Sequence, residues 1–200
     1  MASPFFCECI RKIIHVAGYW NIAVFLVVGY YLQAPKVAFL LLTLVLIIFL
    51  ELEYVRVEHP LFKVPHHFNI FRKKEQKHFG GHVYMTVSAI ICFAAFPLPI
   101  ASAALSMMIM GDLAAALVGK KWGTHTFIFS NKTWEGTIAG FIANIAAGYF
   151  FLNGLPHALF FLLSMAAVAS LVEVFTQKLD DNLTIPVFAG MWGQMLFLFI

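Results

Sequence analysis

The sequence is short of charged residues. Only 12% of its 200 residues are Asp, Glu, Lys or Arg, whereas soluble domains carry about 25%. Hydrophobic residues make up 62% of the chain, and the mean hydropathy is +0.86. One small soluble core could not bury so much apolar surface. The composition therefore excludes an ordinary soluble domain and predicts a polytopic membrane protein.

Cysteine is also scarce. Cys7, Cys9 and Cys92 form no disulfide framework, and the pair Cys7 and Cys9 lacks the second ligand pair of a zinc site. No A-x-A cleavage site follows the first apolar run, so we expect the first span to direct membrane insertion. No internal repeat is visible, and the length leaves no room for a second domain. We therefore expect residues 1–200 to form one integral-membrane domain.

Seven apolar segments predict an all-helical protein with seven transmembrane helices. Several are shorter than the roughly 20 residues that cross a bilayer, which predicts tilted or broken helices. The segments are Ile13–Gln33, Val37–Leu52, His82–Phe96, Ile100–Val118, Trp134–Leu152, His157–Thr176 and Ile185–Ile200.

Basic residues concentrate in alternate connections. The N-terminus and the loops at about 53–81, 119–133 and 177–184 carry all of them except Lys36. The positive-inside rule therefore places the N-terminus in the cytoplasm and the C-terminus outside. That rule does not sort acidic residues, yet all ten fall on the same side. Acids and bases together predict charged chemistry at the cytoplasmic face.

One aspartate lies inside an apolar segment. Asp112 follows Gly111 in the run from Ile100 to Val118, where a charge costs roughly 2.5–3.5 kcal/mol on membrane-insertion scales. In a continuous helix it lies about 12 Å before Lys120 at the helix end. Gly111 would let a ligand or a second helix approach closely. A charge at that depth predicts a functional site.

The segment after this helix has the residues of a phosphate site. Its lysines are Lys120, Lys121 and Lys132. Ser130 or Asn131 is a suitable cap for the next helix, and free N–H groups at a helix N-terminus favour anions. The lysines alone also fit a loop that follows the positive-inside rule. Asp112, Lys132 and Glu135 together favour a site.

A second acidic group lies near the C-terminus. Glu173 ends an apolar segment, and Asp180, Asp181 and Asn182 precede the last one. Oxygen ligands of this kind suit Mg²⁺, which binds a few carboxylates together with substrate phosphates and water. The same residues also fit a capping turn, with Asn182 or Asp181 as the cap. The sequence leaves both interpretations open.

The N-terminal segment adds a third set of charges. Helical spacing places Arg11 and Lys12 on the same side of a helix as His15. They form either a basic anchor at the membrane surface or a further phosphate contact. We attribute the basic run at residues 72–77 mainly to attraction to the membrane surface.

These motifs resemble two related membrane families, the CTP-dependent lipid-alcohol kinases and phosphatidate cytidylyltransferase. The kinases include dolichol kinase, phytol kinase and the CTP-dependent diacylglycerol kinases. Both families have an aspartate in an apolar helix, then a G-[KR]-x-x-G loop and a K-T-x-E-G stretch. Here these are Asp112, residues 119–123 and residues 132–136.

The ends of the chain resemble the kinase branch. Its features here are Arg11-Lys12-x-x-His15, Glu51 followed by Arg56, Glu173, Asp181-Asn182 and Pro186. The long terminal signature expected of the cytidylyltransferases is missing. Trp134 in K-T-W-E-G is at least as typical of the cytidylyltransferases, so cytidylyl transfer to phosphatidate is the alternative reaction.

The resemblance implies transfer of the γ-phosphate of CTP to a membrane lipid alcohol, with Mg²⁺ as cofactor. The acceptor would be a polyprenol such as dolichol, a phytol-like isoprenoid alcohol or diacylglycerol. Asp112, Lys132 and Asp181 would be catalytic, and Asp112, Glu173, Asp181 and Asn182 would hold the metal. The nucleotide and its phosphates would contact Arg11, Lys12, His15, Lys120, Lys121, Thr133, Glu135 and Gly136.

The expected location is the inner or plasma membrane of a prokaryote or the endoplasmic reticulum of a eukaryote. We expect no nucleic-acid partner, and homo-oligomerisation stays open. A small ion or proton transporter is a further alternative. It would need a polar path through both membrane halves, yet His157 is the only ionisable residue in the outer halves of the spans.

Overall fold

The computed structural model describes residue 12 and residues 15–58, 79–130, 132–176 and 179–199. Apart from one isolated bridge between Thr126 and Thr133, the regular structure of this part is entirely helical. Arg11 and the basic run at residues 72–77 lie outside the described residues.

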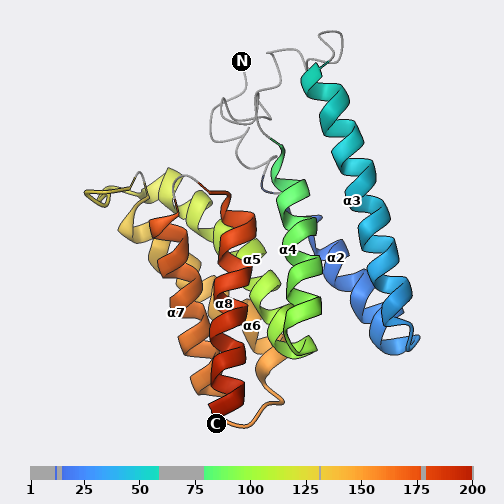
Figure 1. Cartoon of the computed structure of the whole chain (residues 1–200). Helices are drawn as coiled ribbons and strands as arrows, with labels where there is room; N and C mark the ends of the chain where they lie inside the picture. The colour runs from blue at the N-terminus through green and yellow to red at the C-terminus, as the bar shows by residue number, and fades with distance from the viewer. Residues whose placement is uncertain (1–11, 13–14, 59–78, 131, 177–178, 200) are drawn as a thin grey trace.

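The helices follow the expected order along the chain (Figure 1). A short helix α2 continues directly into the π-helix η1, and six longer helices follow. The bounds are α2 Tyr19–Val24, η1 Phe25–Tyr31, α3 Pro35–Glu58, α4 Gly81–Ala95, α5 Leu98–Trp122, α6 Trp134–Leu152, α7 Ala158–Phe175 and α8 Asp181–Phe199.

The helices have the length and composition of membrane spans. In the described part, α3, α5, α6, α7 and α8 are long and apolar enough to cross a bilayer, and α4 and the α2–η1 segment are shorter apolar helices. The protein is therefore an integral membrane protein, as predicted. That all seven segments cross the bilayer stays a prediction.

Two helices extend beyond the apolar runs that predicted them. The run 37–52 belongs to α3, which ends at Glu58, and the run 100–118 belongs to α5, which ends at Trp122. In α3 the extra turns carry an ion pair between Glu53 and Arg56. In α5 they place two lysines beside the C-terminal carbonyl groups, where the helix dipole favours cations. Local charge interactions thus continue both helices.

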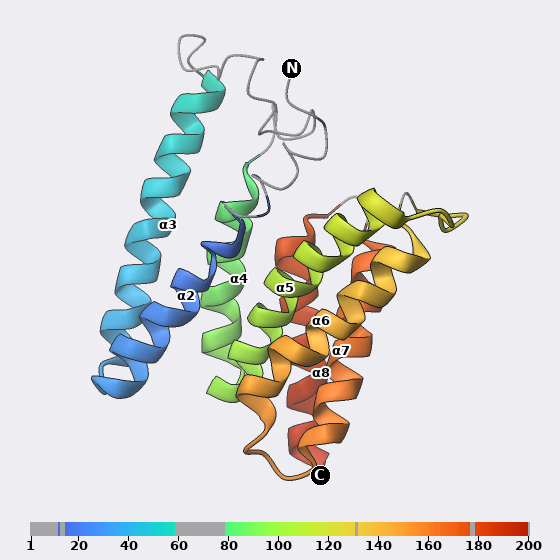
Figure 2. The same ribbon diagram turned by 180° about the vertical axis from the view of Figure 1, so that it is seen from behind.

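Helix α5 lies at the centre of the bundle. In the most apolar 18-residue stretch of α5, 72% of the residues are buried, whereas the figure for α3 is 17%. Helix α3 packs on η1 and α4 at one edge of the bundle (Figures 1 and 2). The most extensive contact of α5 is with α6. Gly136 makes this possible, because a Cβ there would lie 2.7 Å from the Ala115 carbonyl oxygen. Close α5–α6 packing positions Asp112 deep inside the protein.

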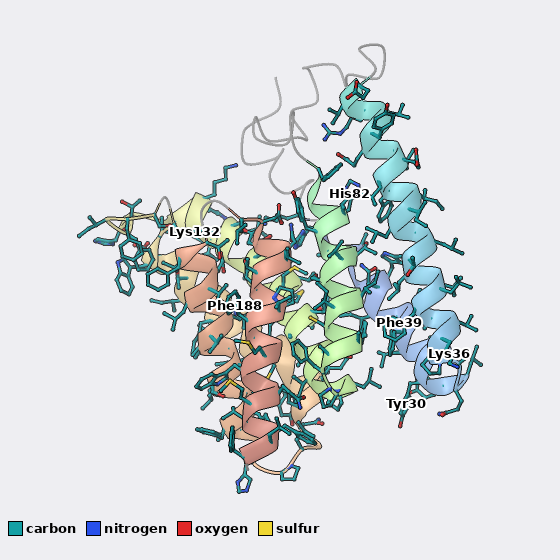
Figure 3. The ribbon with its side chains drawn as sticks, viewed as in Figure 1. Tyr30, Lys36, Phe39, His82, Lys132 and Phe188 are labelled. Carbon is teal, nitrogen blue, oxygen red and sulfur yellow. The ribbon has the colours of Figure 1, made fainter. Side chains whose placement is uncertain are left out.

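The two ends of the bundle differ in polarity. One end, called the loop end below, gathers the C-terminal ends of α3, α5 and α7 with the N-terminal ends of α4, α6 and α8 (Figure 1). Figure 3 places Lys132 and His82 at the loop end, and Lys36 and Tyr30 at the far end. The loop end therefore holds the charged groups discussed next.

Candidate functional site

The Asp112 carboxylate lies buried against the N-terminal segment. Asp112 is 6% exposed, and its Oδ2 accepts a hydrogen bond from Nζ of Lys12, which is 3% exposed. His15 Nε2 lies 3.4 Å from the same oxygen. The i, i+3 spacing of Lys12 and His15 thus presents both side chains to α5, one hundred residues later in the chain.

A second group of charges forms around Lys132, just before α6. Its Nζ donates a hydrogen bond of 2.9 Å to Glu173 Oε1 of α7 and lies 3.8 Å from Asp181 Oδ2 of α8. Glu173 is 4% exposed, whereas the Lys132 side chain keeps a third of its surface accessible. Lys132 therefore joins α6, α7 and α8 at the loop end.

The two groups are electrostatically connected. Burial alone would lower the pKa of Lys132, but the nearby carboxylates of Glu173, Asp181 and Asp112 raise the pKa above its ordinary value of 10.5. Lys132 is therefore a permanent cation at neutral pH. The three carboxylates lie on different helices, and each favours the charged form of Lys132.

The residues that open α6 have mainly local partners. Thr133, rather than Ser130, caps the helix by accepting a hydrogen bond of 3.2 Å from the Gly136 N–H, and Asn131 is outside the described residues. Glu135 accepts a hydrogen bond of 2.7 Å from the Thr124 hydroxyl and lies equally close to His125 Nδ1. The structure thus directs Glu135 into the α5–α6 loop, not toward Lys132.

Other predicted nucleotide contacts lie at the periphery. Lys120 and Lys121 are exposed at the end of α5, and Lys121 Nζ lies 4.4 Å from the centroid of the Trp122 ring. Gly136 packs against α5 backbone. Of the residues assigned to phosphate, the structure brings Lys12 and His15 to Asp112, while Lys120 and Lys121 are exposed in the last turn of α5.

At the start of α8, the residue that caps the helix is not one of the residues predicted for the site. Asp180, not Asp181 or Asn182, caps the helix, because its Oδ1 accepts hydrogen bonds of 3.0 and 2.7 Å from the backbone and side chain of Asn182. Asn182 Oδ1 is buried and has no hydrogen-bond partner within the described residues. Pro186 has no N–H, so the Asn182 carbonyl also lacks its usual helical donor.

These oxygens bear on the predicted metal. Among the described residues, no three His, Cys, Asp or Glu side chains are grouped closely enough to hold an ion alone. Mg²⁺, however, commonly binds one or two carboxylates and takes its remaining ligands from phosphates and water. Asp112, Asp181 and the unpartnered oxygen of Asn182 are oxygen donors of the kind that Mg²⁺ prefers. They do not form a preassembled metal cage.

Sequence reasoning missed part of the polar structure. The kinase resemblance pointed to Glu51 with Arg56, but Glu51 is exposed and Arg56 pairs with Glu53 at 2.6 Å. Glu53 is 3% exposed and also accepts a hydrogen bond from the Gly80 N–H. The i, i+3 spacing of Glu53 and Arg56 was the available signal. The buried bond between Asn144 and Ser170 had none, because either residue alone resembles a helix-packing polar group.

The chain is similar to named lipid kinases. It is 35% identical over 102 residues to a phytol kinase of Synechocystis sp., which covers 48% of this chain and 44% of that protein. It is 32% identical over 111 residues to the chloroplastic farnesol kinase of Arabidopsis thaliana, covering 50% of this chain and 36% of that protein. A CTP-dependent diacylglycerol kinase of Schizosaccharomyces pombe is 28% identical over 134 residues, covering 59% of this chain and 61% of that protein.

These similarities confirm the predicted resemblance to the CTP-dependent lipid-alcohol kinases. The matched region spans less than two thirds of the length of each of these three relatives. No family model matches the chain. No solved structure matches it either.

Proposed function

We propose that this protein transfers the γ-phosphate of CTP to the hydroxyl group of a membrane lipid alcohol. One observation carries the proposal: Asp112, Glu173 and Asp181 meet Lys12 and Lys132 at the loop end of an apolar helix bundle. The kinase names of the similar proteins support the reaction class. The choice of CTP rests on the motif resemblance and on the similar diacylglycerol kinase.

A purely structural role accounts poorly for so many buried charges. Pairing two helices through one polar contact needs a single ion pair, and buried ion pairs are rarely worth their desolvation cost. Ionisable residues inside membrane helices usually mark substrate or ion pathways. Here the charges share one end of the bundle with the exposed Lys120 and Lys121, an arrangement that suits a phosphate-rich ligand.

The proposed mechanism depends mainly on positioning and charge. Lys12 and Lys132 would move from their carboxylates to the phosphates, and His15 would assist near Asp112. The lipid hydroxyl oxygen would attack the γ-phosphorus while the bond to the bridging oxygen breaks and CDP leaves. The hydroxyl proton would pass to Asp112 or Asp181. Mg²⁺, held by Asp112, Asp181 and Asn182 with Glu173 nearby, would supply charge neutralisation.

The site would face the cytoplasm. Lys120, Lys121 and Lys132 lie at the loop end, while Lys36 lies at the far end (Figure 3). The positive-inside rule then assigns the loop end to the side where CTP is available.

A radiochemical assay tests the reaction. Purified protein in lipid nanodiscs receives γ-labelled CTP and Mg²⁺ with phytol, farnesol, dolichol or diacylglycerol. Label in a lipid phosphate is the expected result. Label only in pyrophosphate, formed with phosphatidate as acceptor, would overturn the kinase proposal in favour of the cytidylyltransferase suggested by Trp134. If the protein in sealed vesicles dissipates an ion or proton gradient and does not turn over CTP, it is a transporter.

A further inference from the structure

The loop between α5 and α6 exposes apolar side chains at the polar end of the molecule. This α5–α6 loop, residues 123–133, folds back on itself: the Phe127 N–H donates a hydrogen bond of 3.0 Å to the Lys132 carbonyl, and Thr126 forms a β-bridge with Thr133. In Figure 1 the loop extends sideways from the bundle, about level with the ends of the two helices that it joins. It therefore lies where the spans end, rather than projecting away along their axes.

Ring contacts hold the loop against the neighbouring helices. The Phe127 ring packs on Trp134, the first residue of α6, with the ring centroids 4.3 Å apart. Phe129 stacks on Phe175, the last residue of α7, with centroids 5.3 Å apart and an interplanar angle of 4°. The two loop rings also contact each other at 5.7 Å. Despite these contacts, Phe129, Trp134 and Phe175 each stay more than half exposed.

These rings continue the exposed apolar surface of two spans. On α6, Trp134, Ile138 and Ile142 recur every four residues, and each is more than half exposed. On α7, Leu171 and Phe175 have the same spacing and are exposed to a similar extent. A spacing of four residues keeps side chains on one face of a helix. Because α6 and α7 are long and apolar enough to cross a membrane, the two rows of side chains face lipid and lead directly into the loop.

The tip of the loop is apolar as well. Ile128 is fully exposed, so it adds nothing to the packing of the described residues. Single exposed apolar residues are ordinary, but a contiguous group of them marks a binding surface. We call the exposed side chains of Ile128, Phe129, Trp134 and Phe175 the loop patch.

The residues beside the loop patch are typical of the membrane surface. Lys120 and Lys121 are exposed in the last turn of α5, and Trp122, which ends that helix, is more than half exposed. Tryptophan is enriched at the level of the lipid headgroups, and lysine there extends its ammonium group toward water and anionic headgroups. The charge and the aromatic side chains of this region thus both complement lipid.

We propose that the α5–α6 loop lies in the headgroup layer of the bilayer, with the loop patch at the hydrocarbon boundary. Lipid, rather than a partner protein, covers the patch, because the patch continues without a break into the lipid-facing rows of α6 and α7. The headgroup layer is hydrated, so the polar groups of the loop also meet water there. Lys132 belongs to this loop, which therefore fixes the depth of that lysine at the membrane surface. This location is independent of the reaction that the protein catalyses.

Electron paramagnetic resonance of a single spin label measures the depth of the loop. In a cysteine-free background in nanodiscs of phosphatidylcholine and phosphatidylglycerol, the label is attached at Ile128→Cys. Glu58→Cys, exposed at the end of α3, is the reference in water, and Ile142→Cys is the reference in lipid. Collisions with oxygen, which concentrates in lipid, are compared with collisions with a water-soluble nickel chelate. The ratio of oxygen to nickel collisions at residue 128 should be severalfold higher than at residue 58 and lower than at residue 142.

Two results would overturn the proposal. A collision ratio at residue 128 equal to that at residue 58 would place the loop in water. Low collision rates with both reagents would show that a second protein molecule covers the loop.

A second experiment asks whether the exposed rings hold the loop in the lipid. With the label at Ile128→Cys, Phe129→Ser should lower the collision ratio toward that at residue 58, whereas Phe129→Leu, which keeps the side chain apolar, should retain most of it. Phe160→Ser makes the same change at an equally exposed position near the opposite end of α7 and should leave the ratio unchanged. An unchanged ratio in Phe129→Ser, or an equal loss in the serine and leucine variants, would contradict a lipid contact made by this side chain.

Discussion

The contacts of Asp112 depend on its negative charge. Its carboxylate contacts Lys12 and lies 3.4 Å from His15 Nε2. Asp112→Asn keeps the shape and removes the charge. We expect phosphoryl transfer to fall by about two to three orders of magnitude, as when one preorganised electrostatic contact is removed. Turnover of labelled CTP at saturating lipid measures the effect.

Folding must be separated from catalysis in this variant. Asp112→Asn leaves Lys12 buried without its counter-charge, which is itself destabilising. Adding Lys12→Met removes that penalty, so the double variant should regain thermal stability in detergent while staying inactive. Wild-type turnover in Asp112→Asn would remove Asp112 from the site.

Lys132 gives a pH prediction. Its pKa is above 10.5, because three carboxylates outweigh the effect of burial. A raised lysine pKa stabilises the fold at every pH below the unfolded value, and this contribution is lost only as the pH rises through the folded-state pKa. The difference in Tm between wild type and Lys132→Met should therefore stay constant from neutral pH to about pH 10 and shrink above it.

Activity supplies the matching control for Lys132. Lys132→Arg keeps the charge and should retain part of the turnover with a raised KM for CTP, whereas Lys132→Met should lose it. Equal KM values for CTP in the wild type and Lys132→Met would contradict a phosphate-binding role.

Individual site residues could be predicted only where charge is unusual for its position. Asp112 and Lys12 stood out because each interrupts or borders an apolar run. Asp180 did not, because three adjacent polar residues precede α8 and only the backbone geometry decides which one caps it. Glu53 was passed over for Glu51, because only the orientation of α3 shows which carboxylate faces inward.

The close packing of α5 against α6 depends on glycine at the contact, where a side chain would not fit. A Cβ at Gly136 would lie 2.7 Å from a backbone carbonyl and 3.1 Å from Gly119 Cα, and neither backbone atom can move aside easily. Gly136→Ala should destabilise the protein by about 1–3 kcal/mol, the usual cost of overpacking. Thermal unfolding in detergent measures it.

Gly154 offers a matched control for this substitution. It lies in the turn between α6 and α7, and no atom is within 4 Å of the position that a Cβ would take. Gly154→Ala should leave the Tm unchanged or slightly raised. An equal loss of stability in both variants would contradict the packing explanation.

The helices themselves were largely predictable, and their ends were not. Apolar runs located α3 to α8, because helices that lie in a membrane carry apolar side chains along most of their length. The apolar runs end before α3 and α5 do. The last turns of both helices contain charged residues, which a search for apolar runs excludes. The expected start of α8 at Ile185 was late by four residues for the same reason.

For the whole molecule, the separation of charge predicts orientation. Lys36→Cys at the far end and Ile128→Cys in the exposed α5–α6 loop report on opposite faces. In a background with Cys7, Cys9 and Cys92 changed to Ser, an impermeant maleimide added to intact cells should label Lys36→Cys only. Ile128→Cys should react only after the membrane is opened. The reverse pattern would place the site outside the cell.

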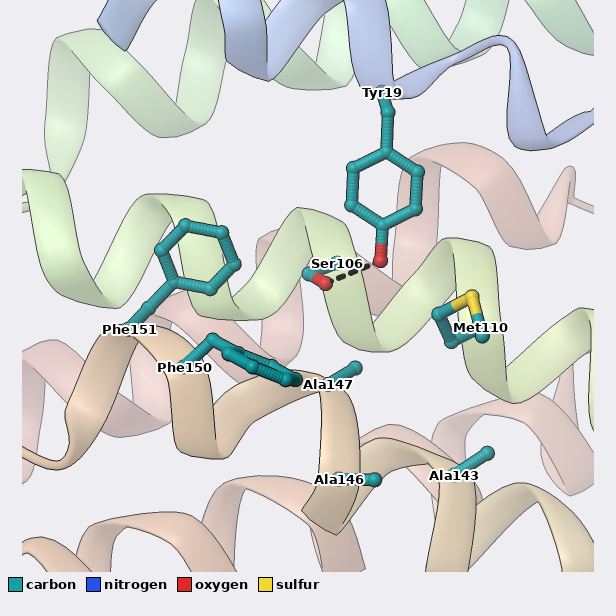
Figure 4. Close-up of a pocket in the computed structure, with 8 residues that line it drawn as sticks. All are labelled: Tyr19, Ser106, Met110, Ala143, Ala146, Ala147, Phe150 and Phe151. Carbon is teal, nitrogen blue, oxygen red and sulfur yellow. Dashed lines mark hydrogen bonds between the residues drawn. The ribbon is translucent and has the colours of Figure 1, made fainter.

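Composition predicted the membrane class of the whole molecule, because no soluble fold could bury this fraction of apolar residues. It did not predict the groove that Tyr19, Ser106 and Met110 line together with α6 (Figure 4). The groove arises because Ala and Phe side chains of α6 and Met110 of α5 leave the space beside Tyr19 unfilled, and Ala or Phe occurs on every helix.

Lys12 and Lys132 offset two of the three carboxylate charges of the site from within the protein. These lysines act as built-in counterions, so a divalent cation without nucleotide must compete with them for the same oxygens. Nucleotide phosphates would draw the lysines away and expose the carboxylates. Metal and CTP should therefore bind cooperatively, each raising the affinity of the other by the same factor. Mn²⁺ titration followed by electron paramagnetic resonance should show weak binding alone and much tighter binding with CTP.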